Sequence, residues 1–316
     1  MRALTVVLCC GIGALACAEE ALTVGPPEIV GQDYKFTEGP LWLGQEGLIF
    51  SDIPADTIYR GNGEVYRRPS GGANGLALDP QGRLLACEGG ATEDARRVAR
   101  YDPGGGVTVL ASSYQGKRLN IPNDLVVDTQ GRVWFTDPFY EDAAGPWSKD
   151  RRHMDLDHES VYRLDPRPEG PWTITRVTFD TTRPNGLLFS PAEDTLYVAQ
   201  SGREPAEKRQ LRAYPVKDGG SLAEPAVWHD FGAHRGIDGM CLDEEGNIFA
   251  TAGWELGGPG PMIYVFSPRG EVLETHPVPC LRPTNCAFGG PGPDTLYVTT
   301  IEGMLLRTRT GRPGRG

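Results

Sequence analysis

The sequence predicts an all-β protein folded as a six-bladed β-propeller around a central channel. Three observations support this fold class. One phrase recurs six times along the chain, a second strand–turn–strand phrase follows each copy, and no long amphipathic helical periodicity occurs between them. Four short strands per repeat, repeated six times, are typical of a six-bladed propeller.

The recurring phrase combines an oxygen-bearing side chain, a short apolar strand, a polar turn and a second strand. TRPNGLLFSP, which begins at Thr182, places Asn-Gly directly ahead of an apolar run. Taken alone, that Asn-Gly would predict a hairpin turn. The repeats start near residues 38, 74, 123, 185, 238 and 285, however, and a period of roughly 50 residues with β content indicates a repeat architecture.

The second phrase of each repeat also contains two strands. RVARYDPGGGVTVLA and MIYVFSPRGEVLETHPV, for example, have Gly, Pro and Asp at the turn between them. The sixth copy ends after GMLLRTRT and lacks its last strand. We expect PPEIVGQDYKF, the stretch before Glu38, to supply that strand, because an open ring would leave two long sheet edges.

The N-terminus, MRALTVVLCCGIGALACAEE, has the pattern of a secretory signal peptide. Arg2 precedes an apolar run, and Ala-Cys-Ala at 16–18 precedes two glutamates. We expect cleavage after Ala18, which leaves 19–316 as a single propeller domain, exported to the periplasm or secreted. A lipoprotein acylated at Cys17 is the alternative, although the residues before it fit that motif poorly. No later apolar segment predicts a membrane span.

Composition argues against nucleic acid as a partner. The formal net charge is −11, and the chain contains no basic run or basic–aromatic stripe. Cleavage would leave four cysteines, of which Cys241 lies in an apolar strand and is expected to be a small buried residue. Cys280 and Cys286 are close enough in sequence to bridge a loop, but spacing alone does not decide whether they pair.

The oxygen-bearing residues that open the repeats predict a metal site. Equivalent repeat positions should lie at one height around the propeller axis, and here they are Glu38, Asn74, Asn123, Asn185, Asp238 and Asn285. A ring of carboxylate and amide oxygens suits Ca²⁺, which takes roughly six to eight oxygen ligands. The absence of sulfur and paired histidines at these positions argues against a dedicated zinc or copper site. Alternatively, these oxygens cap the inner strands or hold water.

The same residues resemble the SMP-30/gluconolactonase/LRE-like family. The resemblance runs from about Phe36 to Leu306 and depends on the phrases FTEGPLW, LNIPNDLVVDTQGRVWFTDP, TRPNGLLFSP, GIDGMCLD and PTNCAFGGPGPDTLYVT. It implies a six-bladed propeller with one divalent metal ion in its channel, and hydrolysis of lactones or, in some members, of organophosphates.

The resemblance also assigns roles to individual residues. It implies that Glu38, Asn185 and Asp238 bind the metal, and that Asn123 is a fourth ligand or a substrate contact. Asp238 is the candidate general base or nucleophile, and Asn74 a candidate substrate contact. Ca²⁺ is the expected ion, with Mg²⁺, Mn²⁺ or Zn²⁺ as alternatives.

Lactone hydrolysis fits this residue set chemically. A bound cation polarises the lactone carbonyl, and a neighbouring carboxylate can accept a proton from the attacking water. The alternative functions are a non-catalytic propeller that serves as a binding platform, or hydrolysis of esters or organophosphates at the same site.

The sequence departs from the family pattern in one place and carries a long insertion in another. Some sugar-lactone members have an arginine two residues before the channel asparagine, where this chain has Ile121. The polar insertion at 138–160 is expected to be a solvated loop. It could also cover the channel mouth, which makes Glu141, Trp147 and His153 candidate substrate contacts.

Overall fold

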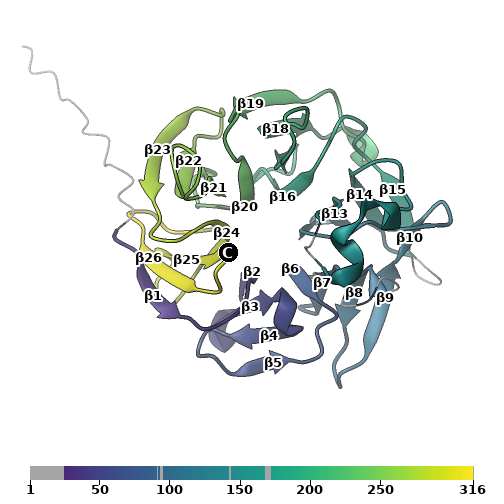
Figure 1. Ribbon diagram of the computed structural model, residues 1–316, viewed down its shortest axis with the longest axis horizontal. Helices are drawn as coiled ribbons and strands as arrows, with labels where there is room; N and C mark the ends of the chain where they lie inside the picture. Colours follow the sequence, from purple (N-terminus) through teal and green to yellow (C-terminus); the bar gives the residue numbers. More distant parts are fainter. Residues whose placement is uncertain (1–24, 91, 93–94, 142–143, 168–171, 316) are drawn as a thin grey trace, which may run out of the picture.

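The computed structural model describes residues 25–90, 92, 95–141, 144–167 and 172–315, and these form a six-bladed β-propeller (Figure 1). Six four-stranded antiparallel sheets surround a central axis. The innermost strands of neighbouring sheets contact one another all round the ring. The fold class predicted from the repeats is therefore confirmed. The predicted signal peptide, including Cys17, lies outside the described residues and stays a prediction.

The first three blades take their strands in chain order from the axis outwards. Blade 1 consists of β2 (Thr37–Trp42), β3 (Leu48–Asp52), β4 (Thr57–Arg60) and β5 (Val65–Arg67). Blade 2 consists of β6 (Ala73–Leu78), β7 (Leu84–Glu88), β8 (Arg97–Tyr101) and β9 (Val107–Ala111). Blade 3 consists of β12 (Leu125–Val127), β13 (Val133–Asp137), β14 (Ser160–Asp165) and β15 (Thr173–Arg176).

The last three blades follow the same plan, except that the chain's first strand completes the sixth. Blade 4 consists of β16 (Pro184–Phe189), β17 (Thr195–Gln200), β18 (Gln210–Pro215) and β19 (Ala226–Asp230). Blade 5 consists of β20 (Ile237–Leu242), β21 (Ile248–Ala252), β22 (Met262–Phe266) and β23 (Val272–Pro277). Blade 6 consists of β24 (Pro283–Gly289), β25 (Thr295–Thr300), β26 (Leu305–Arg309) and β1 (Glu28–Gly31).

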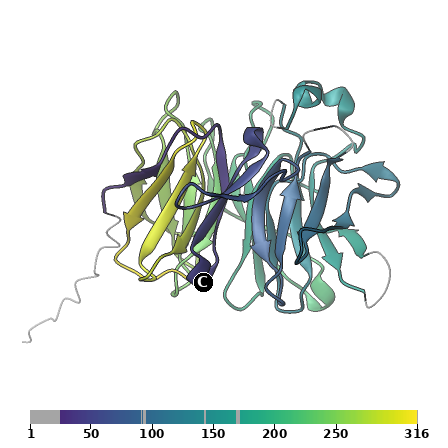
Figure 2. The ribbon, with the colours of Figure 1, turned by 90° about the horizontal axis from the view of Figure 1, so that it is seen from below.

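Short elements fill the connections between these strands. A two-stranded hairpin, β10 (Ser113–Tyr114) with β11 (Lys117–Arg118), links blades 2 and 3. The 3-10 helices are η1 (Gly44–Glu46), η2 (Ile53–Ala55), η4 (Pro146–Lys149), η5 (Arg151–His153) and η6 (Asp218–Gly220). The helices of the predicted insertion, η4 and η5, stand at one end of the propeller (Figure 2). No helix in the described part of the chain has the length and apolar composition to cross a membrane.

The ring is closed by an N-terminal strand, as the truncated sixth repeat predicts. β1 pairs antiparallel with β26, and Ile29 lies opposite Leu306. Val30 packs against the cluster of Phe50 and Leu305, which joins blades 1 and 6. The outermost strand of blade 6 therefore comes from the opposite end of the chain, and it covers the edge that β26 would otherwise expose.

Each interface between neighbouring blades has its own hydrophobic core, so six clusters together surround the axis. Strand β7 shows how one strand contributes to two of them. Leu85 and Cys87 pack toward blade 3, whereas Leu84 and Ala86 pack toward blade 1. Successive side chains of a strand point to opposite faces of its sheet, and both faces of a blade are buried by its neighbours. Apolar runs such as LLAC follow from this arrangement.

The inner strands bulge where the repeats carry their oxygen-bearing residues. In blade 4, Pro184 pairs with Gln200 but Leu187 pairs with Val198, so the inner strand contains one extra residue between the two pairs. Blades 1, 2, 5 and 6 have the same irregularity at the equivalent place. A bulge turns a side chain away from its regular direction. The repeated phrase therefore encodes a bulge at the axis and not a hairpin turn.

Glycine follows the oxygen-bearing residue because neighbouring inner strands approach closely there. A Cβ atom at Gly186 would lie 2.5 Å from the backbone oxygen of Asp238, and one at Gly39 would lie 2.1 Å from that of Asn74. Such distances are well inside van der Waals contact, so only glycine fits without a backbone shift. The glycines thus set how near to one another the channel residues lie.

Hydroxyl groups on the second strands satisfy the backbone of the bulges. The Gly239 amide donates to Thr251 Oγ1 at 3.0 Å, and the Asn285 amide donates to Thr299 Oγ1 at 3.1 Å. Blade 3 repeats the pattern. A buried amide without a partner would cost about 1–3 kcal/mol, so these hydroxyls stabilise the bulges at the ring's centre.

The four cysteines of the propeller are free thiols. Cys241 on β20 and Cys286 on β24 lie with their sulfur atoms 3.5 Å apart. Burial raises the pKa of the Cys241 thiol well above its ordinary value, as expected for a small apolar residue. Cys286 therefore has Cys241 as a sulfur neighbour, and Cys280 is not bonded to it.

Removal of β1 should destabilise the ring. A chain that begins at Gln32 loses the pairing of β1 with β26 and the packing of Val30 on Phe50. Its melting temperature should fall by about 5 °C or more relative to a chain that begins at Gly25. Differential scanning calorimetry of the two proteins measures this difference. Equal melting temperatures would show that the closure contributes no stability.

The close approach of the inner strands can be tested at Gly186. Gly186→Ala should lower the free energy of unfolding by about 1–3 kcal/mol, because its Cβ meets the backbone of the next blade. Gly106→Ala is the matched control, because the nearest atom to its Cβ is 3.8 Å away. Urea denaturation measures both variants. A Gly186→Ala protein as stable as the control would contradict the crowding.

Candidate metal and active site

A cavity of about 300 Å³ opens at the end of the channel where the inner strands begin. Five of the six oxygen-bearing repeat residues line it: Glu38, Asn74, Asn123, Asn185 and Asp238. The sixth, Asn285, instead lines a hollow at the other end of the inner strands. The bulges thus bring to one cavity side chains that lie as much as two hundred residues apart in the sequence.

The two carboxylates of this set, Glu38 and Asp238, are 3% and 4% exposed. Burial raises the pKa of Glu38 well above its ordinary value, and the nearby negative charge of Asp238 raises it further. One bond opposes this effect, because the Gly39 amide donates to Glu38 Oε2 at 2.9 Å. Two buried carboxylates that repel each other create a site that a cation would stabilise.

Two buried asparagines, Asn123 and Asn185, supply uncharged oxygen atoms beside the two carboxylates. Asn185 Nδ2 donates to the Tyr140 hydroxyl at 3.2 Å, which leaves the amide oxygen of Asn185 available as a ligand. The Asn123 backbone is fixed on both sides, because its amide donates to Thr136 and its carbonyl accepts from Gly75. The Asn185 side chain and the Asn123 backbone are therefore held in place without added charge.

The donor chemistry of these residues fits a hard divalent cation. Glu38 and Asp238 carry two negative charges, and Asn123 and Asn185 add neutral oxygens. Among the described residues, no group of three or more His, Cys, Asp or Glu is placed to hold a metal. Any cation at this cavity would therefore depend on amide oxygens as well as carboxylates.

Asp238 also forms an ion pair that the repeat pattern does not predict. Arg235 Nη2 donates to Asp238 Oδ2 at 2.5 Å, and the Arg235 side chain is 12% exposed. Arg203 and Arg282 line the same cavity. Arg235 and Arg282 each lie three residues before the oxygen-bearing residue of their repeat. Their position relative to the repeat was the signal in the sequence that could have identified them.

Asp124 is a third carboxylate in the channel. It follows Asn123 at the position where most repeats have glycine, and it lines the hollow at the far end with Asn285. Burial raises the pKa of Asp124 to about 7, and the charge of Asp238 adds to the increase. The amide of Leu125 opposes this by donating to Asp124 Oδ1 at 2.9 Å. Asp124 thus adds negative potential beneath the cavity.

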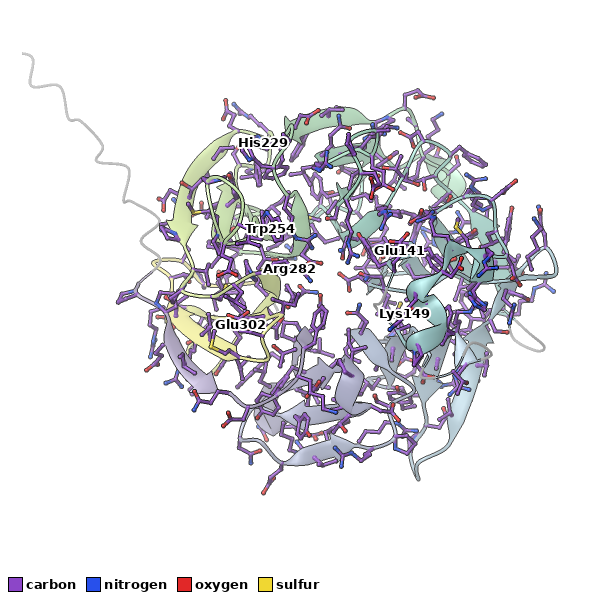
Figure 3. All side chains as sticks on the ribbon, viewed as in Figure 1. Glu141, Lys149, His229, Trp254, Arg282 and Glu302 are labelled. Carbon is purple, nitrogen blue, oxygen red and sulfur yellow. The ribbon has the colours of Figure 1, made fainter. Side chains whose placement is uncertain are left out.

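Of the three insertion residues predicted to contact substrate, only Glu141 lines the cavity. Figure 3 places Glu141 and Arg282 on opposite sides of the central opening. Trp147 packs away from the cavity, where its Nε1 donates to the Gly90 carbonyl at 3.3 Å. The His153 ring contacts the edge of Trp147. The structure therefore brings Trp147 and His153 to each other, beside the mouth and not within it.

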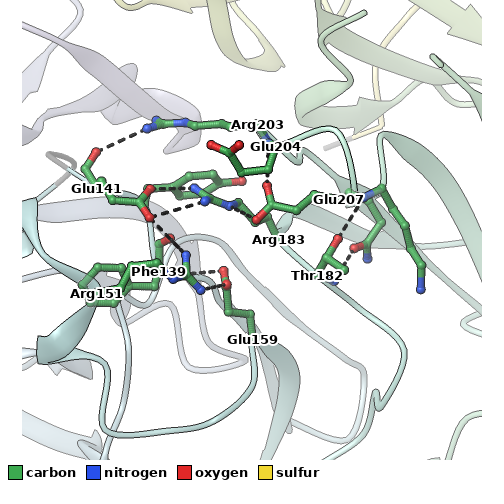
Figure 4. Close-up of polar contacts among 12 residues, drawn as sticks. Phe139, Glu141, Arg151, Glu159, Thr182, Arg183, Arg203, Glu204 and Glu207 are labelled. Carbon is green, nitrogen blue, oxygen red and sulfur yellow. Dashed lines mark hydrogen bonds and ion pairs between the residues drawn. The ribbon is translucent and has the colours of Figure 1, made fainter. Parts of the chain in front are cut away.

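Glu141 belongs to an extended ion-pair network (Figure 4). Arg183 Nη1 lies 2.8 Å from one carboxylate oxygen of Glu141, and Arg151 Nη1 lies 3.2 Å from the other. Arg183 also pairs with Glu207, and Arg151 with Glu159. Burial alone would raise the pKa of Glu141, but hydrogen bonds from the two arginines hold it at about 2. This network fixes the insertion at the rim of the cavity.

Comparison with known proteins identifies relatives that match nearly the whole chain. The chain is 31% identical to a gluconolactonase of Zymomonas mobilis over 90% of this chain and 82% of that protein. It is 27% identical to regucalcin of Xenopus laevis over 91% of each chain. A solved gluconolactonase structure from Xanthomonas campestris superposes with a TM-score of 0.72 and 30% identity, over 90% of this chain and 89% of that one.

The family comparison covers the whole propeller ring from blade 1 to blade 6. The model of the SMP-30/gluconolactonase/LRE-like region matches residues 36–302, which include every channel residue described above. The chain therefore belongs to the SMP-30/gluconolactonase/LRE-like family.

Proposed function

We propose that the protein opens lactone rings by hydrolysis, with one divalent cation in its channel. The observation that carries this proposal is the convergence of Glu38, Asp238, Asn123 and Asn185 on one cavity. The names of its relatives support the substrate class. A gluconolactonase and a pentonolactonase are 31% and 27% identical to this chain.

Glu38, Asn185 and Asp238 would hold the cation, with Asn123 as a fourth ligand or a substrate contact. Their oxygens favour Ca²⁺ over softer metals. When bound, the cation would polarise the lactone carbonyl and stabilise the negative charge that develops on its oxygen. Because the buried carboxylates of Glu38 and Asp238 repel each other, a cation bound between them would relieve that repulsion.

Asp238 would also accept a proton from the attacking water. Its carboxylate lines the cavity, and the bond from Arg235 holds Oδ2 in a fixed orientation. Oδ1 would then be the oxygen that faces both the cation and the attacking water. Asn74 and Asn123 would contact the hydroxyl and ring oxygens of the substrate, while Ile121 and Pro122 provide an apolar wall.

The cation site can be tested at Glu38. Glu38→Gln keeps the shape of the side chain but removes one of two negative charges, so Ca²⁺ affinity should fall about tenfold or more. Isothermal titration calorimetry with CaCl₂ measures the dissociation constant. Glu64→Gln, an exposed glutamate on blade 1, is the matched control and should leave it unchanged. Unchanged affinity in Glu38→Gln would remove Glu38 from the proposed ligand set.

The proton acceptor can be tested at Asp238. Asp238→Asn should lower kcat for glucono-1,5-lactone by about 10²–10⁴, the usual effect of removing a general base. The variant also loses metal affinity, so turnover is compared at saturating Ca²⁺ in a pH-drop assay. A decrease below about tenfold would leave Asp238 as a ligand only. No hydrolysis of any lactone or ester by the unmodified protein would instead favour a binding platform.

A further inference from the structure

We propose that the preferred substrate is an anionic lactone, one that carries a carboxylate, phosphate or sulfonate group besides its ring ester. This inference rests on the proposed function and names the substrate class of that site. The structural basis is a cationic wall on one side of the cavity, formed by Arg203, Arg235 and Arg282.

The three arginines come from consecutive blades and therefore form one continuous wall. Arg203 follows β17 of blade 4, Arg235 precedes β20 of blade 5, and Arg282 precedes β24 of blade 6. Arg203 is exposed at the rim, whereas Arg235 reaches the floor, where it contacts Asp238. The wall thus extends from the reacting end of the cavity to its mouth.

The opposite wall is mainly apolar and carries no cation among the described lining residues. Blades 1 to 3 contribute Phe36, Ile53, Ile121 and Pro122 to the lining. The acids on that side are Glu38, a proposed cation ligand, and Glu141, which pairs with Arg183 and Arg151. A bound molecule would therefore meet an apolar surface on one side and guanidinium groups on the other.

The guanidinium groups retain hydrogen-bonding capacity that the described protein residues do not use. Arg235 Nε and Arg282 Nε are buried without a hydrogen-bond partner among the described residues. Arg203 donates only a long bond of 3.3 Å to the Glu141 carbonyl. Each guanidinium has five N–H donors, and an unpaired buried donor is unfavourable. A ligand with several anionic oxygens would satisfy them.

The electrostatics of the wall point the same way. Burial lowers the pKa of Arg282 to about 10, and the positive charge of Arg235 contributes to the decrease. The walls of the cavity partly desolvate Arg203, although it reaches the rim, and this lowers its pKa, as does the charge of Arg235. Three carboxylates, those of Glu38, Asp238 and Glu141, line the same cavity, so the described lining is formally balanced in charge. A divalent cation on Glu38 and Asp238 would give it an excess of positive charge.

An anionic substituent on the lactone would balance this charge. Guanidinium groups bind carboxylate, phosphate and sulfonate oxygens in paired hydrogen bonds, which add geometric selectivity to charge. A neutral lactone would leave the wall unpaired.

Binding can be tested separately from catalysis. Isothermal titration calorimetry is performed with gluconate, 6-phosphogluconate and glucarate, on protein treated with EDTA and on protein saturated with Ca²⁺. Glucarate and 6-phosphogluconate, which carry a second anionic group, should each bind at least about tenfold more tightly than gluconate. The comparison of glucarate with 6-phosphogluconate distinguishes a carboxylate from a phosphate site. Equal dissociation constants for all three compounds would overturn the proposal.

Variants show whether the wall is responsible. Arg282→Gln and Arg203→Gln should each reduce the preference for 6-phosphogluconate over gluconate at least about fivefold. Arg269→Gln removes the same charge from an exposed turn and should keep the preference. Arg203 is exposed, so its variant tests the proposal even when Arg282→Gln fails to fold. A preference that survives in both cavity variants would contradict the assignment.

Turnover separates this inference from the proposed function. The ratio of kcat/KM for 6-phosphogluconolactone to that for glucono-1,5-lactone should exceed about ten and fall in both cavity variants. Hydrolysis of both lactones at equal rates would overturn the inference and leave the proposed lactonase activity intact. Arginine-dependent binding of 6-phosphogluconate without hydrolysis of either lactone would support the anion-binding wall and contradict the proposed lactonase activity.

Discussion

The close packing of the inner strands around the axis is the constraint on which the rest of this structure depends. At Gly39 and Gly186 a single methyl group would collide with the backbone of the next blade. Because the blades meet so closely there, a bulge in the inner strands of blades 1, 2, 4, 5 and 6 directs one side chain of each into the channel. The same contact fixes the angle between neighbouring blades, so the six interblade cores outside it can pack as apolar layers.

This arrangement explains which features could be predicted from sequence. The recurring phrase predicts the propeller because every copy must meet the same steric demand at the axis. The truncated sixth repeat predicts closure by β1, which pairs with β26. Five oxygen-bearing residues reach one cavity because repeat position determines height along the channel. Asn285 is the exception: it begins the sixth repeat, yet it lines the hollow at the far end.

The remaining features depend on contacts that no repeat encodes. Arg203 lies in a loop after a second strand, so only the folded ring brings it near Arg235 and Arg282. Asp124 replaces a glycine of the repeat, and its raised pKa follows from burial and not from its neighbours in sequence. Trp147 and His153 are on the predicted insertion, but Trp147 bonds to Gly90 and contacts the His153 ring, and neither residue lines the cavity.

The channel itself combines charges of both signs at short range. Glu38 and Asp238 face the cavity from blades 1 and 5, and Arg235 is bonded to Asp238. Such groups are unfavourable to bury alone; Asp238 is stabilised by the opposite charge of Arg235, and Glu38 by a hydrogen bond from the Gly39 amide. The rigid ring holds them in place through backbone bonds at the bulges, which side-chain motion does not disturb. The backbone of the ring, and not solvent, therefore holds these charged groups in position.

The pairing of the first strand with the last has a consequence for the order in which the molecule forms. Blades 1 to 5 are each built from consecutive strands, so each can fold locally as its segment becomes available. Blade 6 cannot fold in this way, because Ile29 pairs with Leu306, which is near the opposite end of the chain. Contacts of such sequence separation are slow to form. Ring closure should thus be the final step of folding, and a partly synthesised chain would expose an unfinished sheet edge until its last strand arrives.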